Sequence, residues 1–287
     1  MKKKIVCFGE ALWDNFPDYK EIGGAPLNVA FHLKKLGIDT QFITRLGEDE
    51  MGRQILEFID EIGFENSLIQ IDKKFNTGEV NISLDKSKSA NYIIKYPCAW
   101  DKIEITDNYI KIVEDSDFFV FGSLISRDKI SRETLLKLVS HANFKIFDVN
   151  IREPYYDFEL ISFLMQESNM IKFNEEEIER ISKDLGISSI SIENKILEIS
   201  KITNTEFICL TLGDKGVVFY DSKFHYQDAI KTKVLNTVGA GDSFLAMIIE
   251  GMISGKSVEL FLKRAVNLSA YVCSKNGPNP EYNKDQF

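Results

Sequence analysis

Short apolar runs alternate with segments of helical period along most of the chain. We expect buried strands at the apolar runs, which span residues 5–8, 41–45, 118–121, 145–149, 170–173 and 207–210. Helical patterns lie between them: the segment 26–36 has Pro26 in its first turn, and the segment 51–62 is followed by Gly63. This alternation predicts an α/β fold with a mostly parallel central sheet that helices cover on both faces.

Two early segments, residues 15–22 and 77–97, interrupt this pattern. Polar and apolar residues alternate there without helical period, as in Glu79-Val80-Asn81-Ile82. A period of two is typical of strands, so we predict that both segments contribute to a small separate sheet. This sheet would form a lid inserted into a single domain that spans residues 1–287.

Composition restricts the partners and the compartment. The chain has 35 basic and 44 acidic side chains, a net charge of −9, and no basic stripe, so we expect no nucleic acid partner. We also expect no membrane partner, because no apolar run approaches the ~18 residues of a membrane span. The four cysteines form no C-x-x-C pair, so reduced thiols in the cytoplasm are expected.

Residues 236–244 carry the chemistry that is easiest to interpret. The small residues Gly239, Ala240 and Gly241 precede Asp242, and an apolar helical segment follows. The first N–H groups of a helix lack internal partners and, with the helix dipole, form an anion site. We therefore expect Asp242 to be ionised and able to accept a hydroxyl proton during phosphoryl transfer. The alternative is a turn followed by a first-turn acid that only complements the dipole.

Two other phosphate-binding motifs do not match. Residues 239–244 start like G-x-G-x-x-G, but Phe244 stands at the last glycine position. Residues 251–257 resemble a P-loop with one residue too few between the glycines, and they follow a helix instead of a strand. A dinucleotide-dependent oxidoreductase is therefore a remote alternative.

Four motifs in order give a resemblance to a known family. Residues 236–244 resemble the D-T-x-G-A-G-D signature of the ribokinase-like (PfkB) carbohydrate kinases, and residues 23–30 resemble their N-terminal glycine-rich signature. Residues 174–177 match N-x-x-E, and residues 211–216 resemble T-x-G-x-x-G. The resemblance implies a ribokinase-like three-layer α/β/α fold with a small β-sheet lid. Residues 9–14, 23–26 and 148–152 resemble the fructokinase branch.

The resemblance also implies roles for individual residues. Asp242 would be the catalytic base, with the amides of Gly239, Ala240 and Gly241 stabilising the transferred phosphoryl group. The sugar would be bound by Asp14, Gly24, Asn28, Asn150 and Arg152. Asp14 would follow a strand at the carboxyl edge of the main sheet, and residues 148, 150 and 152 would share one side if the chain stays extended. A turn aspartate, a solvent-facing asparagine and a strand-end salt bridge are the simpler alternatives.

The nucleotide side is implied in the same way. It would be formed by Asn174, Thr211, Gly213, Gly216 and Asn267, while Glu177 would act on Mg²⁺ through water. The alternatives are structural: Asn174 and Glu177 fit a capping box, and residues 211–216 fit a tight hairpin. Trp100 either packs in the core or covers the sugar.

One departure from the family pattern concerns K⁺. Asn236 stands where the family signature has Asp, and Val238 stands where many members have Thr. The turn often helps to hold a monovalent cation in the family. Losing a charge there leaves K⁺ binding open, because carbonyl oxygens could still supply ligands.

The resemblance thus leads to one function with several alternatives. We expect transfer of the γ-phosphoryl group of MgATP to fructose. Ribose, 2-keto-3-deoxygluconate and a nucleoside are alternative acceptors, and a sugar or nucleotide sensor without turnover is an alternative of another class. Exposed edges of the lid sheet also predict a homodimer that pairs two lids.

Overall fold

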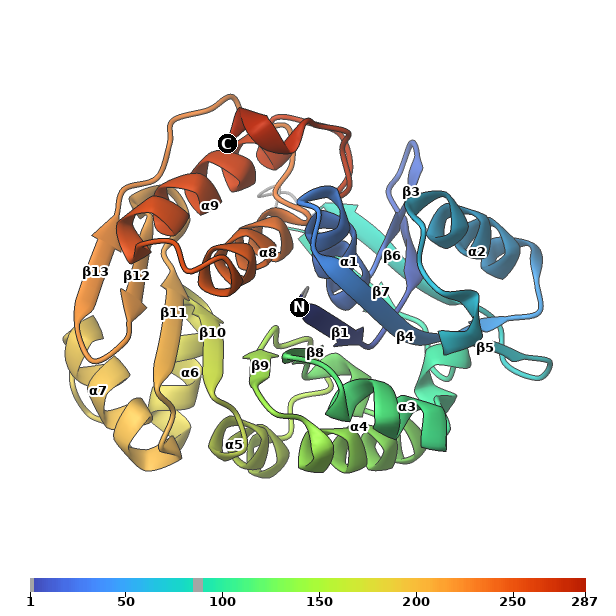
Figure 1. Cartoon of the computed structure of the whole chain (residues 1–287), viewed down its shortest axis with the longest axis horizontal. Coiled ribbons are helices and arrows are strands. Elements are labelled where there is room, and N and C mark those ends of the chain that lie inside the picture. The colour runs from blue at the N-terminus through green and yellow to red at the C-terminus, as the bar shows by residue number, and fades with distance from the viewer. Residues whose placement is uncertain (1–2, 85–89) are drawn as a thin grey trace.

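The computed structural model describes residues 3–84 and 90–287, and these form two sheets (Figure 1). In spatial order, the larger sheet consists of β13 (Phe224–Gln227), β12 (Val217–Tyr220), β11 (Phe207–Thr211), β10 (Met170–Asn174), β9 (Lys145–Asp148), β8 (Phe118–Gly122), β1 (Lys4–Phe8), β4 (Asp39–Gly47) and β5 (Ile69–Asp72). From β11 to β5 all neighbours are parallel, whereas β12 and β13 are antiparallel. The predicted mostly parallel sheet is confirmed, and each apolar run predicted as a strand lies in it.

Helices cover both faces of this sheet. They are α1 (Ala25–Lys35), α2 (Glu50–Ile62), α3 (Asp107–Glu114), α4 (Lys129–His141), α5 (Phe158–Gln166), α6 (Glu175–Asp184), α7 (Ile192–Thr203), α8 (Ala240–Ile253) and α9 (Val258–Cys273). Buried side chains of α1, α2, α8 and α9 form one hydrophobic cluster, and those of α3 to α7 belong to a second. The fold is therefore a three-layer α/β/α arrangement (Figure 1).

Strand β1 shows why the central strands read as continuous apolar runs. Ile5 and Cys7 pack into the first cluster, whereas Val6 and Phe8 pack into the second. Successive side chains of a strand point to opposite faces, and here both faces are covered by helices. No position in the strand interior is therefore left for a solvated polar side chain.

The smaller sheet has the order β3 (Lys20–Gly23), β2 (Leu12–Asn15), β6 (Gly78–Leu84) and β7 (Ala90–Ile94). Strands β2 and β3 form an antiparallel hairpin, β6 and β7 form another, and β2 pairs with β6 in parallel. The prediction of a small separate sheet is confirmed. Residues 85–89 of the predicted lid segment lie outside the described residues.

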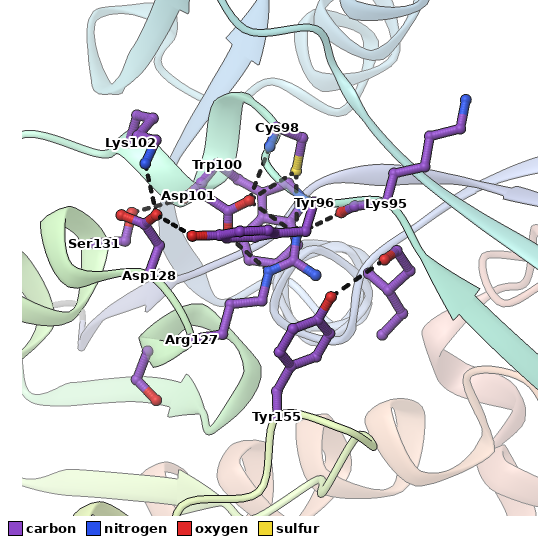
Figure 2. A network of polar contacts seen from close by, with 12 residues as sticks. Lys95, Tyr96, Cys98, Trp100, Asp101, Lys102, Arg127, Asp128, Ser131 and Tyr155 are labelled. Carbon is purple, nitrogen blue, oxygen red and sulfur yellow. Dashed lines mark hydrogen bonds and ion pairs between the residues drawn. The ribbon is translucent and has the colours of Figure 1, made fainter.

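A group of five side chains, the anchor cluster, lies at the start of β6 and the end of β7 (Figure 2). Its members are Tyr96, Trp100, Asp101, Arg127 and Tyr155. Arg127 pairs with Asp101 through Nε to Oδ1 at 2.7 Å and Nη2 to Oδ2 at 2.9 Å. The guanidinium carbon lies 3.9 Å from the ring centre of Trp100, 4.7 Å from that of Tyr155 and 5.2 Å from that of Tyr96.

The anchor cluster holds the end of β7. Arg127 Nη2 donates a hydrogen bond to the Lys95 carbonyl at 2.6 Å, and the Tyr155 hydroxyl donates to the Ile94 carbonyl at 3.4 Å (Figure 2). Trp100 is fully buried, so it packs in the core and does not cover a ligand. Of the two interpretations of this tryptophan, the structure favours the first.

None of the helices in residues 3–84 and 90–287 is long and apolar enough to cross a membrane.

Candidate active site

A cavity of about 770 Å³ lies between the carboxyl ends of the central strands and the small sheet. The small sheet forms one wall with Leu12, Asp14, Val80 and Ile94. Most of the predicted site residues line this cavity, namely Asp14, Gly24, Asn28, Asn150, Arg152, Asn174, Glu177, Thr211, Gly213, Gly239, Gly241 and Asp242. Residues that are far apart in sequence are therefore brought to one place.

Three predicted residues do not line the cavity. The Ala240 amide donates to the Thr237 carbonyl at 3.2 Å, so this amide is already used within the turn. Gly216 sits in a tight turn at φ +110, where a side chain would collide with the Gln227 carbonyl. Asn267 donates to the carbonyl of Lys263 on its own helix at 2.7 Å. Nucleotide roles for Gly216 and Asn267 stay predictions that the cavity does not support.

The segment 211–216 is a hairpin that also reaches the cavity. Strands β11 and β12 pair antiparallel, and the Leu212 amide donates to the Gly216 carbonyl at 2.8 Å. The structural interpretation of this motif is thus correct. Thr211 and Gly213 nevertheless line the cavity, so the turn also forms part of its wall.

The start of α8 forms an amide cradle. Gly239 caps the helix in the left-handed region at φ +77, a conformation that glycine adopts at little cost. Among the described residues, the amides of Gly241 and Asp242 have no hydrogen-bond partner. Gly241 lines the cavity, so unpaired N–H groups and the positive end of the helix dipole are available to an anion there.

The Asp242 carboxylate lies at the same end of the cavity. Its Oδ2 accepts a hydrogen bond from Asn28 Nδ2 at 2.8 Å. Burial and the neighbouring Asp148 raise the pKa of Asp242 to about 6, although Asn28, Lys172 and Arg152 act in the opposite direction. The helix terminus was expected to favour the ionised form of this carboxyl; burial acts against that form and raises the pKa, although a pKa of about 6 still leaves the group mostly ionised at pH 7.

A buried lysine that the sequence analysis missed lies beside the cradle. Lys172 Nζ pairs with Asp148 Oδ1 at 2.8 Å, with 8% and 6% of the two side chains exposed. A methyl group on Gly241 would lie 3.4 Å from this Nζ. Burial alone would lower the pKa of Lys172, but the Asp148 carboxylate raises it, so the lysine is charged. The only sequence signal is a lysine inside an otherwise apolar strand.

Asn174 and Glu177 form the capping box that was one of two interpretations. Asn174 Oδ1 accepts from the Glu177 amide at 2.8 Å, and Glu177 Oε2 accepts from the Asn174 amide at 2.8 Å. Glu177 Oε1 accepts from the Ile151 amide at 2.9 Å. Burial raises the pKa of Glu177, and its side chain lines the cavity.

These contacts decide how a divalent metal could fit. The described residues contain no group of three or more His, Cys, Asp or Glu side chains that could hold a metal directly. Mg²⁺ commonly keeps several waters and uses one or two carboxylates together with substrate phosphates. Glu177 and its neighbours Glu175 and Glu176 all line the cavity, which fits a metal bound through water.

Two further acids, Glu10 and Asp14, line the cavity. Asp14 lies within β2 of the small sheet, so its predicted place after a strand of the main sheet was wrong. Burial raises the pKa of Asp14 to about 7, and burial raises the pKa of Glu10 to about 7 as well. Glu10 is 3% exposed, and its Oε2 has no hydrogen-bond partner among the described residues. Glu10 belongs to the motif at residues 9–14, but the sequence analysis assigned it no role; it lies two residues after β1.

The chain turns sharply after β9. Asn150 has φ +40, a left-handed conformation that asparagine tolerates better than most residues, so the expected extended course past Asp148 is wrong. Asn150 and Arg152 nevertheless line the cavity, and Arg152 Nη1 donates to the Ile151 carbonyl at 3.1 Å. Asp148 instead pairs with Lys172, which places these alternating side chains in different environments.

Comparison with known proteins agrees with this geometry. The model of the pfkB family of carbohydrate kinases matches residues 3–285. The chain is 30% identical over 276 residues to a sugar kinase of Pyrococcus horikoshii described as uncharacterized, covering 93% of this chain and 86% of that protein. It is 25% identical over 301 residues to the fructokinase of Solanum tuberosum, covering 96% of this chain and 91% of that protein.

Solved structures share the fold. The Pyrococcus horikoshii kinase aligns with a TM-score of 0.85 at 24% identity, covering 99% of this chain and 96% of that chain. The 2-dehydro-3-deoxygluconokinase of Thermotoga maritima aligns with a TM-score of 0.88 at 20% identity, covering 100% and 97%. The predicted ribokinase-like fold is therefore confirmed.

Proposed function

Since this chain belongs to the pfkB family of carbohydrate kinases, we propose that it transfers the γ-phosphoryl group of ATP to fructose and releases fructose 6-phosphate. One observation carries the proposal: Asp242 lies in the cavity beside unpaired helix amides, and the acidic side chains of Glu10 and Asp14 line the same cavity. The fructokinase relatives and the fructokinase-like motifs support fructose as the acceptor.

In this mechanism each wall of the cavity has one task. Asp14 and Arg152 bind sugar hydroxyls and direct one hydroxyl toward Asp242. Asp242 accepts the proton of that hydroxyl as its oxygen attacks the γ-phosphorus, and the bond to the ADP oxygen breaks. The amides of Gly241 and Asp242, with the ammonium group of Lys172, stabilise the charge of the transferred group.

The raised pKa of Asp242 suits a base that works near neutral pH. A carboxyl with a pKa of about 6 is mostly ionised at pH 7 and is a stronger base than an ordinary aspartate. We therefore expect kcat/KM to fall below about pH 6, as Asp242 becomes protonated.

Mg²⁺ accompanies ATP in the proposed reaction. Glu177 would hold it through water, and the ion would neutralise charge on the nucleotide phosphates. The case for K⁺ is weaker, because Asn236 Oδ1 accepts from the Val238 amide at 3.1 Å and Asn236 Nδ2 donates to the Lys275 carbonyl at 3.2 Å. Any K⁺ site at this turn would rest on backbone carbonyl oxygens.

A sugar panel in a coupled ADP-release assay tests the proposal. The panel contains fructose, ribose, 2-keto-3-deoxygluconate and a nucleoside, each with MgATP and with or without K⁺. We expect the highest kcat/KM for fructose and a loss of about 10²–10⁴-fold in kcat for Asp242→Asn.

Each other result has a clear meaning. Turnover of the nucleoside alone would reject fructose as the acceptor. Binding of sugar and ATP without turnover by the parent protein would indicate a sensor, and a nicotinamide-dependent absorbance change would indicate an oxidoreductase. Full activity of Asp242→Asn would reject the assigned base.

We also propose that the protein acts in the cytoplasm as a homodimer. Strands β3 and β7 are the edges of the small sheet, and an edge strand carries unpaired backbone groups that a second copy could cover. Light scattering at micromolar concentration should give about twice the mass of one chain, and the mass of a single chain would contradict the dimer.

A further inference from the structure

A segment that follows α9, residues 277–282, contacts α1 through His32 and Asn28. It touches the helix cap of α8, because a methyl group on Gly239 would lie 2.5 Å from Pro278 Cβ. No motif in the sequence analysis fell on this segment. Its contacts nevertheless reach both the small sheet and the predicted base.

A buried histidine on α1 fixes the segment in place. His32 is fully buried, and burial lowers its pKa to about 4, so the ring is neutral. Its Nε2 lies 3.0 Å from the Pro278 carbonyl, and its Nδ1 lies 2.9 Å from the Tyr282 hydroxyl. The neutral ring can donate to the carbonyl and accept from the hydroxyl. Asn28 lies one helical turn earlier on the same face of α1.

Asn279 connects this segment to the base. Its Nδ2 donates to Asn28 Oδ1 at 2.9 Å and to the Ile22 carbonyl of β3 at 3.2 Å. Asn28 Nδ2 in turn donates to Asp242 Oδ2 at 2.8 Å. Both hydrogens of the Asn279 amide are thus used, and the two amides form a chain of donors that ends on the carboxylate.

The direction of these two hydrogen bonds affects the ionisation of Asp242. An amide presents either its oxygen or its N–H₂ group to a neighbour, and rotation by 180° exchanges the two. Because Asn279 binds the Asn28 oxygen, the Asn28 N–H₂ group is left facing Asp242. A hydrogen bond donated to a carboxylate stabilises its ionised form.

We propose that Asn279 is a positioning residue for Asp242, holding the Asn28 amide with its N–H₂ group toward the carboxylate. Because the same Asn279 amide binds the Ile22 carbonyl, the orientation of Asn28 also depends on the place of β3. The small sheet and the base are coupled through the side chains of Asn279 and Asn28. The proposal rests on the function proposed above, in which Asp242 accepts the proton.

Other charged groups also face Asp242, and the test keeps them constant. They lie on β9, on β10, in the loop after β9, after β1 and on β2: Asp148, Lys172, Arg152, Glu10 and Asp14. The variants below alter none of them. A change in the titration of Asp242 can therefore be assigned to residue 279.

The test measures the titration of Asp242 directly. In protein with ¹³C-labelled aspartate, the Asp242 carboxyl signal is identified by its absence in Asp242→Asn and is followed by NMR as pH changes. Asn279→Leu removes both donors without adding charge, and Asn279→Asp replaces the donors with acceptors. We expect both to raise the pKa of Asp242, by about one unit, the size of one hydrogen bond to a charged group.

Two controls separate the alternatives. Asn276→Asp adds the same charge at an exposed side chain directly before the segment, and should leave the titration unchanged. A shift in Asn279→Asp alone, with none in Asn279→Leu, would show simple repulsion and overturn the proposal. If Asn279→Asp does not fold, Asn279→Leu decides the question.

The kinetic profile provides the second readout. The acid limb of kcat/KM should move to higher pH in the two Asn279 variants by the same amount as the NMR titration, while kcat on the alkaline plateau changes little. A parent protein that phosphorylates no sugar would reject the proposed function, yet the NMR titration would still test the role of Asn279. An unshifted titration in an active protein would reject the positioning role alone.

Discussion

Two groups of buried charges lie next to the small sheet, and they differ in how their charge is balanced. In the anchor cluster, Arg127 and Asp101 form a two-point ion pair with 0% of either side chain exposed. In the cavity, burial raises the pKa of Glu10 and of Asp14 to about 7 and that of Asp242 to about 6. One group is matched in charge, whereas the other holds acids that are costly to ionise.

This difference indicates that the anchor cluster stabilises the fold, whereas the cavity acids are placed to contact a ligand. A buried pair with good geometry loses most when one partner is removed, because the remaining charge is left uncompensated. A carboxyl with a raised pKa instead destabilises the folded protein when it ionises. Removing an acid should therefore have opposite effects on the free energy of unfolding in the two places.

The largest expected effect is at the anchor cluster. Asp101→Asn leaves the Arg127 guanidinium buried without its counter-ion, and should lower the free energy of unfolding by about 3–5 kcal/mol. Urea unfolding at pH 7 measures this loss. Glu133→Gln breaks the exposed pair with Lys129 and serves as the control, with an expected cost of about 0–1 kcal/mol. Equal losses in the two variants would refute the matched-pair interpretation.

A smaller effect is expected where β6 passes over the anchor cluster. A methyl group on Gly78 would lie 2.3 Å from Trp100 Nε1, and the fully buried indole has little room to move. Gly78→Ala should therefore cost about 2 kcal/mol in the same assay. Gly122→Ala is the matched control, because its added methyl group would meet only the Asp148 carbonyl at 3.5 Å. If Gly78→Ala is neutral, the hairpin is not packed tightly on this cluster.

The smallest effect has the opposite sign. Asp242 has an ordinary pKa of 3.8 in the unfolded chain and about 6 in the native protein, so its ionisation lowers stability as pH rises from about 4 to 6. Above pH 6 the penalty is constant. Asp242→Asn should therefore be more stable than the parent by about 1 kcal/mol at pH 7, allowing for partial solvent screening.

Unfolding by urea at pH 5, 6, 7 and 8 checks this sign. The difference between Asp242→Asn and the parent should grow from pH 5 to pH 6 and then level off. Asp214→Asn, at an exposed position, should show no such growth. If Asp242→Asn is less stable than the parent at pH 7, the charge of Asp242 stabilises the fold, as the charges of the anchor cluster do.

Much of the fold was predictable because it depends on local patterns. Buried parallel strands are apolar on both faces, so β1, β4 and β8 to β11 are visible as short runs. Strand β13 was not predicted, because Phe224–Gln227 is short and of mixed polarity. Strand β12, Val217–Tyr220, is apolar but only four residues long, and it was not predicted either. Asn150 could not be placed either, since a single left-handed residue redirects the chain without a periodic trace.

The site was predictable only where motifs marked it. Glycine-rich signatures pointed to Asp242 and Asn28, but Lys172 and Glu10 are single charges inside or beside buried strands and resemble ordinary strand-end residues. Asn279 lies 251 residues from its partner Asn28, and no local pattern reports a contact at that distance. Polar side chains whose partners are distant in sequence can be recognised only from the three-dimensional structure.

The hydrogen bond between Asn28 and Asp242 has a consequence for assembly. It joins residues 214 positions apart, so the entropy of closing a loop of that length must be lost before the two side chains can meet. Contacts of such long range form slowly, and the local helices and strands can appear well before them. A partly synthesised or refolding chain can thus form its secondary structure before Asn28 meets Asp242. The candidate site is therefore completed only at the end of folding.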